Sequence, residues 1–301
     1  MPQTASPTGA VSHDARPIDW KRLLPGMLVT LIVALSVHVV MLQVLDIPYP
    51  TPSGQPAAVS LAKGVLNIVA LAVFFRLARE SLPGRLPFQA LILFLLDAGL
   101  RESLRGAAME GFVTTAYAYS FVHALGRVAP LLIRDLLLVL AAGSIRRWSL
   151  LVPVLIAIAA AVAFWLQPAI GAATGQLLAG LGLQEHEDVY LMPYGWRVLI
   201  PAYATFVEPV ISCMIMAALV WPRFAGRSVT VWLLSFAVLA ALIRGSLELM
   251  ALDSFFVPQP LWLAFLSTGQ FCFETLALAA LSAAVWRWAG GTSSAVAAGR
   301  E

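Results

Sequence analysis

The stretch "RESLRGAAMEGF", residues 101–112, places two arginines and two acids at the end of an apolar run. A second stretch, "RGSLELMALDSF", residues 244–255, follows another apolar run. Both contain Arg-x-Ser-Leu, then five residues, an acid, one residue and Phe, with no gap between the two patterns. The shared charged and Ser positions indicate an internal repeat, a feature that decides the architecture of a chain.

The composition around these stretches is that of an integral membrane protein. Of the 301 residues, 60% are hydrophobic and 12% are charged, whereas a soluble domain carries about a quarter charged residues. The net charge of +3 comes from short basic clusters between apolar runs and not from one basic face, so no nucleic-acid partner is expected. The expected surroundings are membrane lipids.

Apolar segments long enough to cross a bilayer recur along the whole chain. Each crossing needs about 20 apolar residues, and the sequence therefore predicts an all-α, polytopic membrane helix bundle with eight transmembrane helices. The predicted spans are residues 27–46, 62–79, 86–105, 120–144, 150–168, 200–221, 229–250 and 261–285.

The basic residues predict the orientation of these spans. Lys and Arg concentrate in every second predicted loop, and Lys21 and Arg22 precede the first span. By the positive-inside rule both termini are cytoplasmic, with an N-terminal tail over 1–25 and a C-terminal tail over 290–301. We expect a multi-pass protein of a bacterial inner (plasma) membrane.

The two similar stretches divide the predicted spans into two sets of four. The first repeat is expected over 26–147 and the second over 148–289. Four spans return the chain to its starting side, so the repeats would be parallel and related by an axis along the membrane normal.

Ionisable residues inside the predicted spans are the candidate functional groups, because such residues usually face a bundle interior or a wet cavity. Asp97, Arg101 and Arg105 are spaced by four residues, which places them on one helical stripe. Arg244 and Glu248 have the same spacing. We expect Arg101 or Arg105 to face Asp135 and Arg244 to face Glu274, across an interface between the third and fourth spans of each half.

These charges allow two interpretations. Buried ion pairs can neutralise one another and fix helix register. Alternatively, they line a polar cavity between the repeats that binds an anionic small molecule or lipid head group, since guanidinium groups bind such anions in a bidentate manner. The residues expected to line this cavity are Arg101, Arg105, Arg127, Arg134, Asp135, Arg244, Glu248 and Glu274.

No cofactor and no metal are predicted. Cys213 and Cys272 lie in apolar segments and have no metal-ligand spacing, so both are expected in the core. His38 and His123 differ in depth, which disfavours a haem. His186 belongs to the hydrophilic loop "QEHEDVY", which we expect to be solvated.

Three functions are consistent with these features of the sequence. The first is a small permease, or a carrier that handles lipids or anions, with its site between the repeats. The second is an intramembrane enzyme that acts on a lipid or lipid-linked substrate at the outer face, with acid and base supplied by Glu102, His123, Glu208 or Asp253. The third is a non-catalytic subunit of an envelope complex, whose charges bind the spans of a membrane protein partner.

Overall fold

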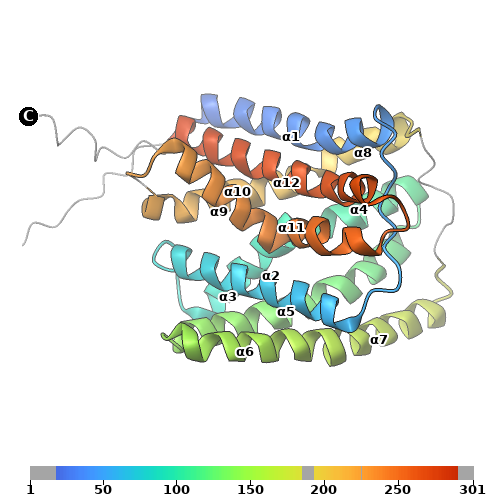
Figure 1. The fold of residues 1–301 in the computed structure, drawn as a ribbon, viewed down its shortest axis with the longest axis horizontal. Helices are drawn as coiled ribbons and strands as arrows, with labels where there is room; N and C mark the ends of the chain where they lie inside the picture. The colour runs from blue at the N-terminus through green and yellow to red at the C-terminus, as the bar shows by residue number, and fades with distance from the viewer. Residues whose placement is uncertain (1–17, 185–192, 225, 291–301) are drawn as a thin grey trace, which may run out of the picture.

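A computed structural model describes residues 18–184, 193–224 and 226–290, and this part of the chain is helical, with no strand. The helices pack side by side, with α1 along one edge of the molecule and α6 and α7 along the opposite edge (Figure 1). The elements are α1 (Trp20–Gln43), α2 (Ala57–Ala78), α3 (Leu86–Leu100), α4 (Ser103–Thr114), α5 (Tyr117–Ser144), α6 (Trp148–Ala161), η1 (Val162–Leu166), α7 (Gln167–Gly180), α8 (Trp196–Thr205), α9 (Val207–Phe224), α10 (Val229–Arg244), α11 (Ser246–Glu248), η2 (Leu249–Asp253), η3 (Ser254–Phe256) and α12 (Leu261–Ala289).

Long apolar helices make the chain a multi-pass membrane protein. Within the described ranges, five segments are long and apolar enough to cross a membrane: α1, α2, α6 with α7, α8 with α9, and α12. A sixth is the bent pair formed by α10 and the segment from Ser246 to Phe256. The two remaining predicted spans fall on α3, which has 15 residues, and on α5, which contains Arg127, Arg134 and Asp135. The structure thus supports five or six spans, and the number eight stays a prediction.

Both Arg-x-Ser-Leu segments lie at helix breaks, where the sequence predicts unbroken spans over 86–105 and 229–250. The helix α3 ends at Leu100, and Glu102 adopts a left-handed conformation with φ of 60° before α4 begins. The helix α10 ends at Arg244, and Gly245 is left-handed with φ of 81°. The chain bends by 80° at this second break. Glycine adopts positive φ readily, whereas a glutamate there is under backbone strain.

Two further irregularities follow from prolines. Pro209 has no N–H to donate to the carbonyl of Thr205, and the helix is interrupted at Phe206, between α8 and α9. Pro168 likewise leaves the carbonyl of Phe164 without its usual donor, and the five-residue π-helix η1 lies at this point of the long α6–α7 segment.

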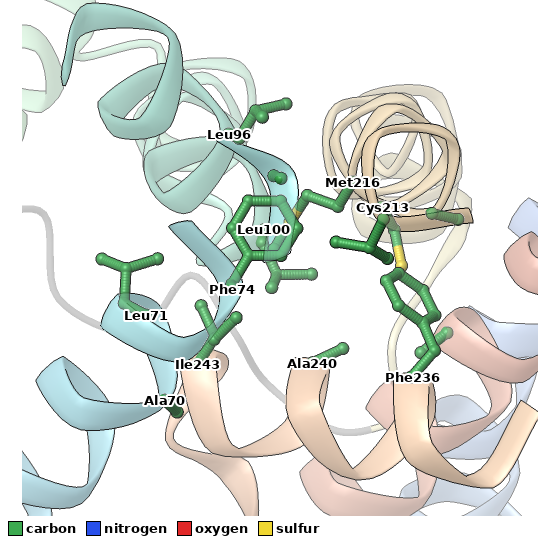
Figure 2. Packing of buried hydrophobic residues seen from close by; sticks show 14 of the residues in the cluster. Ala70, Leu71, Phe74, Leu96, Leu100, Cys213, Met216, Phe236, Ala240 and Ile243 are labelled. Atoms are coloured by element: carbon green, nitrogen blue, oxygen red, sulfur yellow. The ribbon is translucent and has the colours of Figure 1, made fainter. Parts of the chain in front are cut away.

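The apolar core forms where helices from both halves of the sequence meet. Figure 2 shows side chains of α2, α3, α9 and α10 converging, among them Phe74, Leu100, Met216 and Phe236. The helix α12 packs against α1, α9 and α10, and α5 packs against α6 and α7. Helices of residues 26–147 and of residues 148–289 are therefore interleaved, and the proposed division into two repeats stays a prediction.

Close helix packing at α1 yields a test of the fold. A Cβ atom added at Gly26 would overlap Cγ1 of Val285 on α12, whereas one added at Gly171 on α7 meets no atom within 4 Å. We expect Gly26→Val to lower the stability by about 1–3 kcal/mol, because the added methyl groups overfill the α1–α12 contact. Gly171→Val is the matched control.

Thermal unfolding of the two purified variants in detergent measures this difference. The expected result is a clear fall in the midpoint for Gly26→Val and a small change for Gly171→Val. Equal midpoints would show that α1 does not pack on α12 through Gly26.

Candidate functional site

The candidate site is built around Arg101, which follows the last residue of α3. Its Nε donates to both carboxylate oxygens of Asp97 at 3.0 Å, one helical turn earlier. Its terminal nitrogens reach the end of α10, donating to the carbonyl of Ile243 at 2.5 Å and to that of Arg244 at 3.5 Å. The carbonyls at a helix C-terminus lack intrahelical partners and carry partial negative charge, so a cation binds there favourably.

Arg244, at the end of α10, makes the reciprocal connection to the break between α3 and α4. Its guanidinium pairs with Glu102, donates to Thr275 at 3.1 Å and lies 2.8 Å from Glu274 on α12. The structure therefore contains the expected pair of Arg244 and Glu274. It also joins each helix break to the other, because Arg101 binds carbonyls at the second break and Arg244 binds the carboxylate at the first.

A third arginine, Arg134 on α5, is buried and completes the network. Its Nε donates to Asp135 at 2.8 Å, and its other nitrogens bind Asp97 and, at 2.9 Å, Asn67 on α2. The expected contact of Asp135 with Arg101 or Arg105 is therefore wrong, because Asp135 pairs with its chain neighbour. Asp97 takes the place of the expected partner and accepts from both Arg101 and Arg134.

The helix breaks also correct the predicted stripe of charges. Arg105 belongs to α4 and not to the helix of Asp97, and it pairs with Glu102. Glu248 lies beyond the bend at Gly245 and forms no described ion pair with Arg244, although a spacing of four residues would place the two on one stripe of an unbroken helix. Its side chain is 2% exposed, and neither carboxylate oxygen has a hydrogen-bond partner among the described residues.

Glu208, at the start of α9, binds the N-terminus of α4. Its two carboxylate oxygens accept from the backbone N–H groups of Leu104, at 3.1 Å, and Arg105, at 2.5 Å. The first N–H groups of a helix have no intrahelical acceptor, and a carboxylate satisfies them. Glu208 thus fixes α4 to α9 and lies close to Glu102.

The other residues predicted as acids and bases lie in different contacts. Asp253 in η2 pairs with Lys63 on α2 at 2.8 Å. His123 on α5 has its Nδ1 3.5 Å from Glu110 on α4, and Arg127 lies 3.9 Å from the same carboxylate. The structure brings Glu102 and Glu208 together at the start of α4, and it places His123 and Asp253 in separate pairs.

A cavity of 540 Å3, here called the cationic cavity, gathers the arginines of both helix breaks. Its basic lining residues are Lys63, Arg101, Arg127, Arg134 and Arg244. Its other polar lining residues are Ser60, Asn67 and Gln167, and no acidic residue of the described chain lines it. The π-helix η1 contributes Val162 to the wall, and the bend after α10 contributes Gly245 and Leu249.

Four of the eight predicted cavity residues line this cavity: Arg101, Arg127, Arg134 and Arg244. Asp135 and Glu274 pair with its lining arginines, Arg105 lines a different cavity, and Glu248 is not among the lining residues. Sequence reasoning did not single out Lys63. The signal was present, because Lys63 is a single lysine at the start of the predicted span 62–79.

The metal-ligating residue types do not cluster in the part of the chain that the structure describes: it holds no group of three or more His, Cys, Asp or Glu suited to a metal ion. The loop residue His186 lies outside the described residues. Cys213 and Cys272 are both free and buried.

No family model, no curated protein and no solved structure matches the chain.

The buried network and a surface ion pair are expected to differ strongly in their contribution to stability. Arg244→Ala leaves Glu102 and Glu274 without their common partner, and loss of one member of a buried pair costs about 3–5 kcal/mol. The control is Arg223→Ala, which removes an exposed pair with Glu80 at 2.6 Å and should cost about 0–1 kcal/mol.

Chemical unfolding of both purified variants, followed by tryptophan fluorescence, measures the two losses. An Arg244→Ala protein as stable as Arg223→Ala would contradict the described network.

Proposed function

We propose that this multi-pass membrane protein binds the phosphate or carboxylate group of its substrate in the cationic cavity and acts as a small anion or lipid carrier. One observation carries the proposal: five basic side chains line this cavity, and no acidic residue of the described chain lines it. The acids that pair with these side chains, such as Asp97 and Glu102, are not among the lining residues. An anion in the cavity therefore meets cationic and neutral groups and no carboxylate among the lining residues.

Arg127 is the lining residue most available to a ligand. Its side chain is 53% exposed, and its one described ion pair, to Glu110, spans 3.9 Å. Arg101 and Arg134 use several nitrogens on Asp97 and on neighbouring groups, so they supply a fixed positive field. A planar guanidinium with free donors binds a phosphate or carboxylate through two parallel hydrogen bonds.

The backbone around the cavity supports a carrier. Membrane transporters form their substrate sites at discontinuous helices, where freed backbone groups and charged residues meet. The cationic cavity lies against two such discontinuities, the break at Gly245 and the π-helix η1. Both elements contribute lining residues, so a change in either one alters the shape of the site.

Anion binding can be tested by thermal unfolding of the purified full-length protein. Inorganic phosphate, pyrophosphate and succinate would be titrated separately at constant ionic strength. At least one of them should raise the midpoint saturably, because a ligand at 100 times its Kd stabilises the folded state by about 2.7 kcal/mol.

Arg127→Gln should weaken that binding about tenfold, which corresponds to about 1.4 kcal/mol. Arg146→Gln, at an exposed residue that does not line the cationic cavity, is the matched control. No saturable effect of any of the three anions, or equal losses in the two variants, would contradict the proposed site.

The carrier step is tested separately in liposomes. Protein reconstituted with the stabilising anion inside should release it down its gradient, and Arg127→Gln should slow the release relative to Arg146→Gln. Chemical conversion of a lipid without release of the anion would favour an enzyme.

A further inference from the structure

We infer that a second cavity, between α1, α4 and α8, binds a single acyl chain with its carbonyl oxygen on Arg105. This cavity, here called the acyl cavity, has a volume of 600 Å3. Pockets for small ligands typically measure about 300–1,000 Å3 and combine apolar walls with a few polar groups. The acyl cavity shares no lining residue with the cationic cavity.

The walls of the acyl cavity fit a hydrocarbon chain. Leu35 and Val39 come from α1, Met109 comes from α4, and Val198, Leu199 and Ala202 come from α8. Apolar side chains next to the cavity face outward on the same helices, since Val40 is 42% exposed and Ile200 is 62% exposed. In a membrane these residues face lipid, so an acyl chain of the bilayer has access to the cavity between α1 and α8.

Arg105 provides the polar anchor. One terminal nitrogen pairs with Glu102, and the guanidinium carbon lies 5.1 Å from the ring centroid of Phe206, which holds the group in place. Its Nε is buried and has no acceptor among the described residues. A buried N–H without an acceptor is unfavourable, and an acceptor oxygen on a ligand would remove that cost.

The neighbouring charges favour a carbonyl oxygen over a second full anion. Arg105 and Arg244 are matched by Glu102 and Glu274, two cations against two carboxylates. The Nδ1 of His38, which also lines the cavity, is buried, lies 4.0 Å from Glu274 and has no described hydrogen-bond partner. A lipid ester and a protonated fatty acid both present the neutral carbonyl oxygen that this end of the cavity can bind.

The test uses the full-length protein in nanodiscs with a palmitic acid that carries a diazirine on its chain. After irradiation, labelled peptides should come from α1, α4 and α8. Unlabelled palmitate and monopalmitoylglycerol are the two competing sources of an acyl carbonyl, and hexadecanol has a chain of equal length without the carbonyl. Displacement by palmitate alone identifies a free acid, and displacement by monopalmitoylglycerol alone identifies an ester. Displacement by hexadecanol at equal concentration would overturn the role of Arg105.

Three variants separate the site from general lipid contact. Leu199→Trp fills the cavity and should reduce labelling at least tenfold, whereas Ile200→Trp on the lipid-facing side should leave it unchanged. Arg105→Lys keeps the charge beside Glu102 but lacks Nε, so palmitate should lose its advantage over hexadecanol. Equal labelling of Leu199→Trp and Ile200→Trp, or labelling outside the three helices, would overturn the inference.

Discussion

A guanidinium inside an apolar helix bundle must find acceptors for its donors, because burial without partners costs several kcal/mol. This requirement organises the protein. Unbroken helices offer few free acceptors, since their carbonyls are bonded internally. The chain breaks two helices at the Arg-x-Ser-Leu segments, and the break in α10 exposes the carbonyls that bind Arg101. Arg244 in turn binds Glu102 at the other break. Each segment therefore supplies hydrogen-bond acceptors for the arginine of the other segment.

These contacts between the two helix breaks also place positive charge along the cationic cavity. Three arginines form ion pairs with acids and also line the cationic cavity. They are Arg101, paired with Asp97; Arg134, paired with Asp97 and Asp135; and Arg244, paired with Glu102 and Glu274. Interior ion pairs of this kind offset the free-energy cost of burying the guanidinium groups, and they also fix the orientation of each group. The two interpretations of the charges in the sequence, structural pairing and an anion site, are therefore compatible, because arginines that form ion pairs also line the cavity proposed to bind an anion.

Much of this organisation could be predicted from the sequence. Composition gives the helical membrane class, and the repeated polar pattern marks the two segments that converge in the structure. The pair of Arg244 and Glu274 follows from their positions in neighbouring spans. Gly245, a residue suited to positive φ, was a visible signal for the second break.

Other features depend on tertiary contacts that the spacing of residues in the sequence does not predict. The break at Glu102 had no local signal, because a strained left-handed glutamate persists only where its surroundings hold it, here through Arg105 and Arg244. The partner of Asp135 is its neighbour Arg134, since burial turns that guanidinium toward both Asp135 and Asp97. The cationic cavity itself depends on how α5, η1 and the bent α10–α11 segment meet, and no periodicity encodes that arrangement.

The most direct test of the account is a double-mutant cycle on the contact between the two helix breaks. Glu102→Gln, Arg244→Gln and the double variant would be unfolded chemically under identical conditions, and the coupling free energy calculated from the three losses. Residues in direct contact within one network couple by about 0.5–3 kcal/mol, and a favourable coupling above about 1 kcal/mol is predicted for this buried pair. Additive losses, with a coupling near zero, would contradict the reciprocal interlock of the two segments.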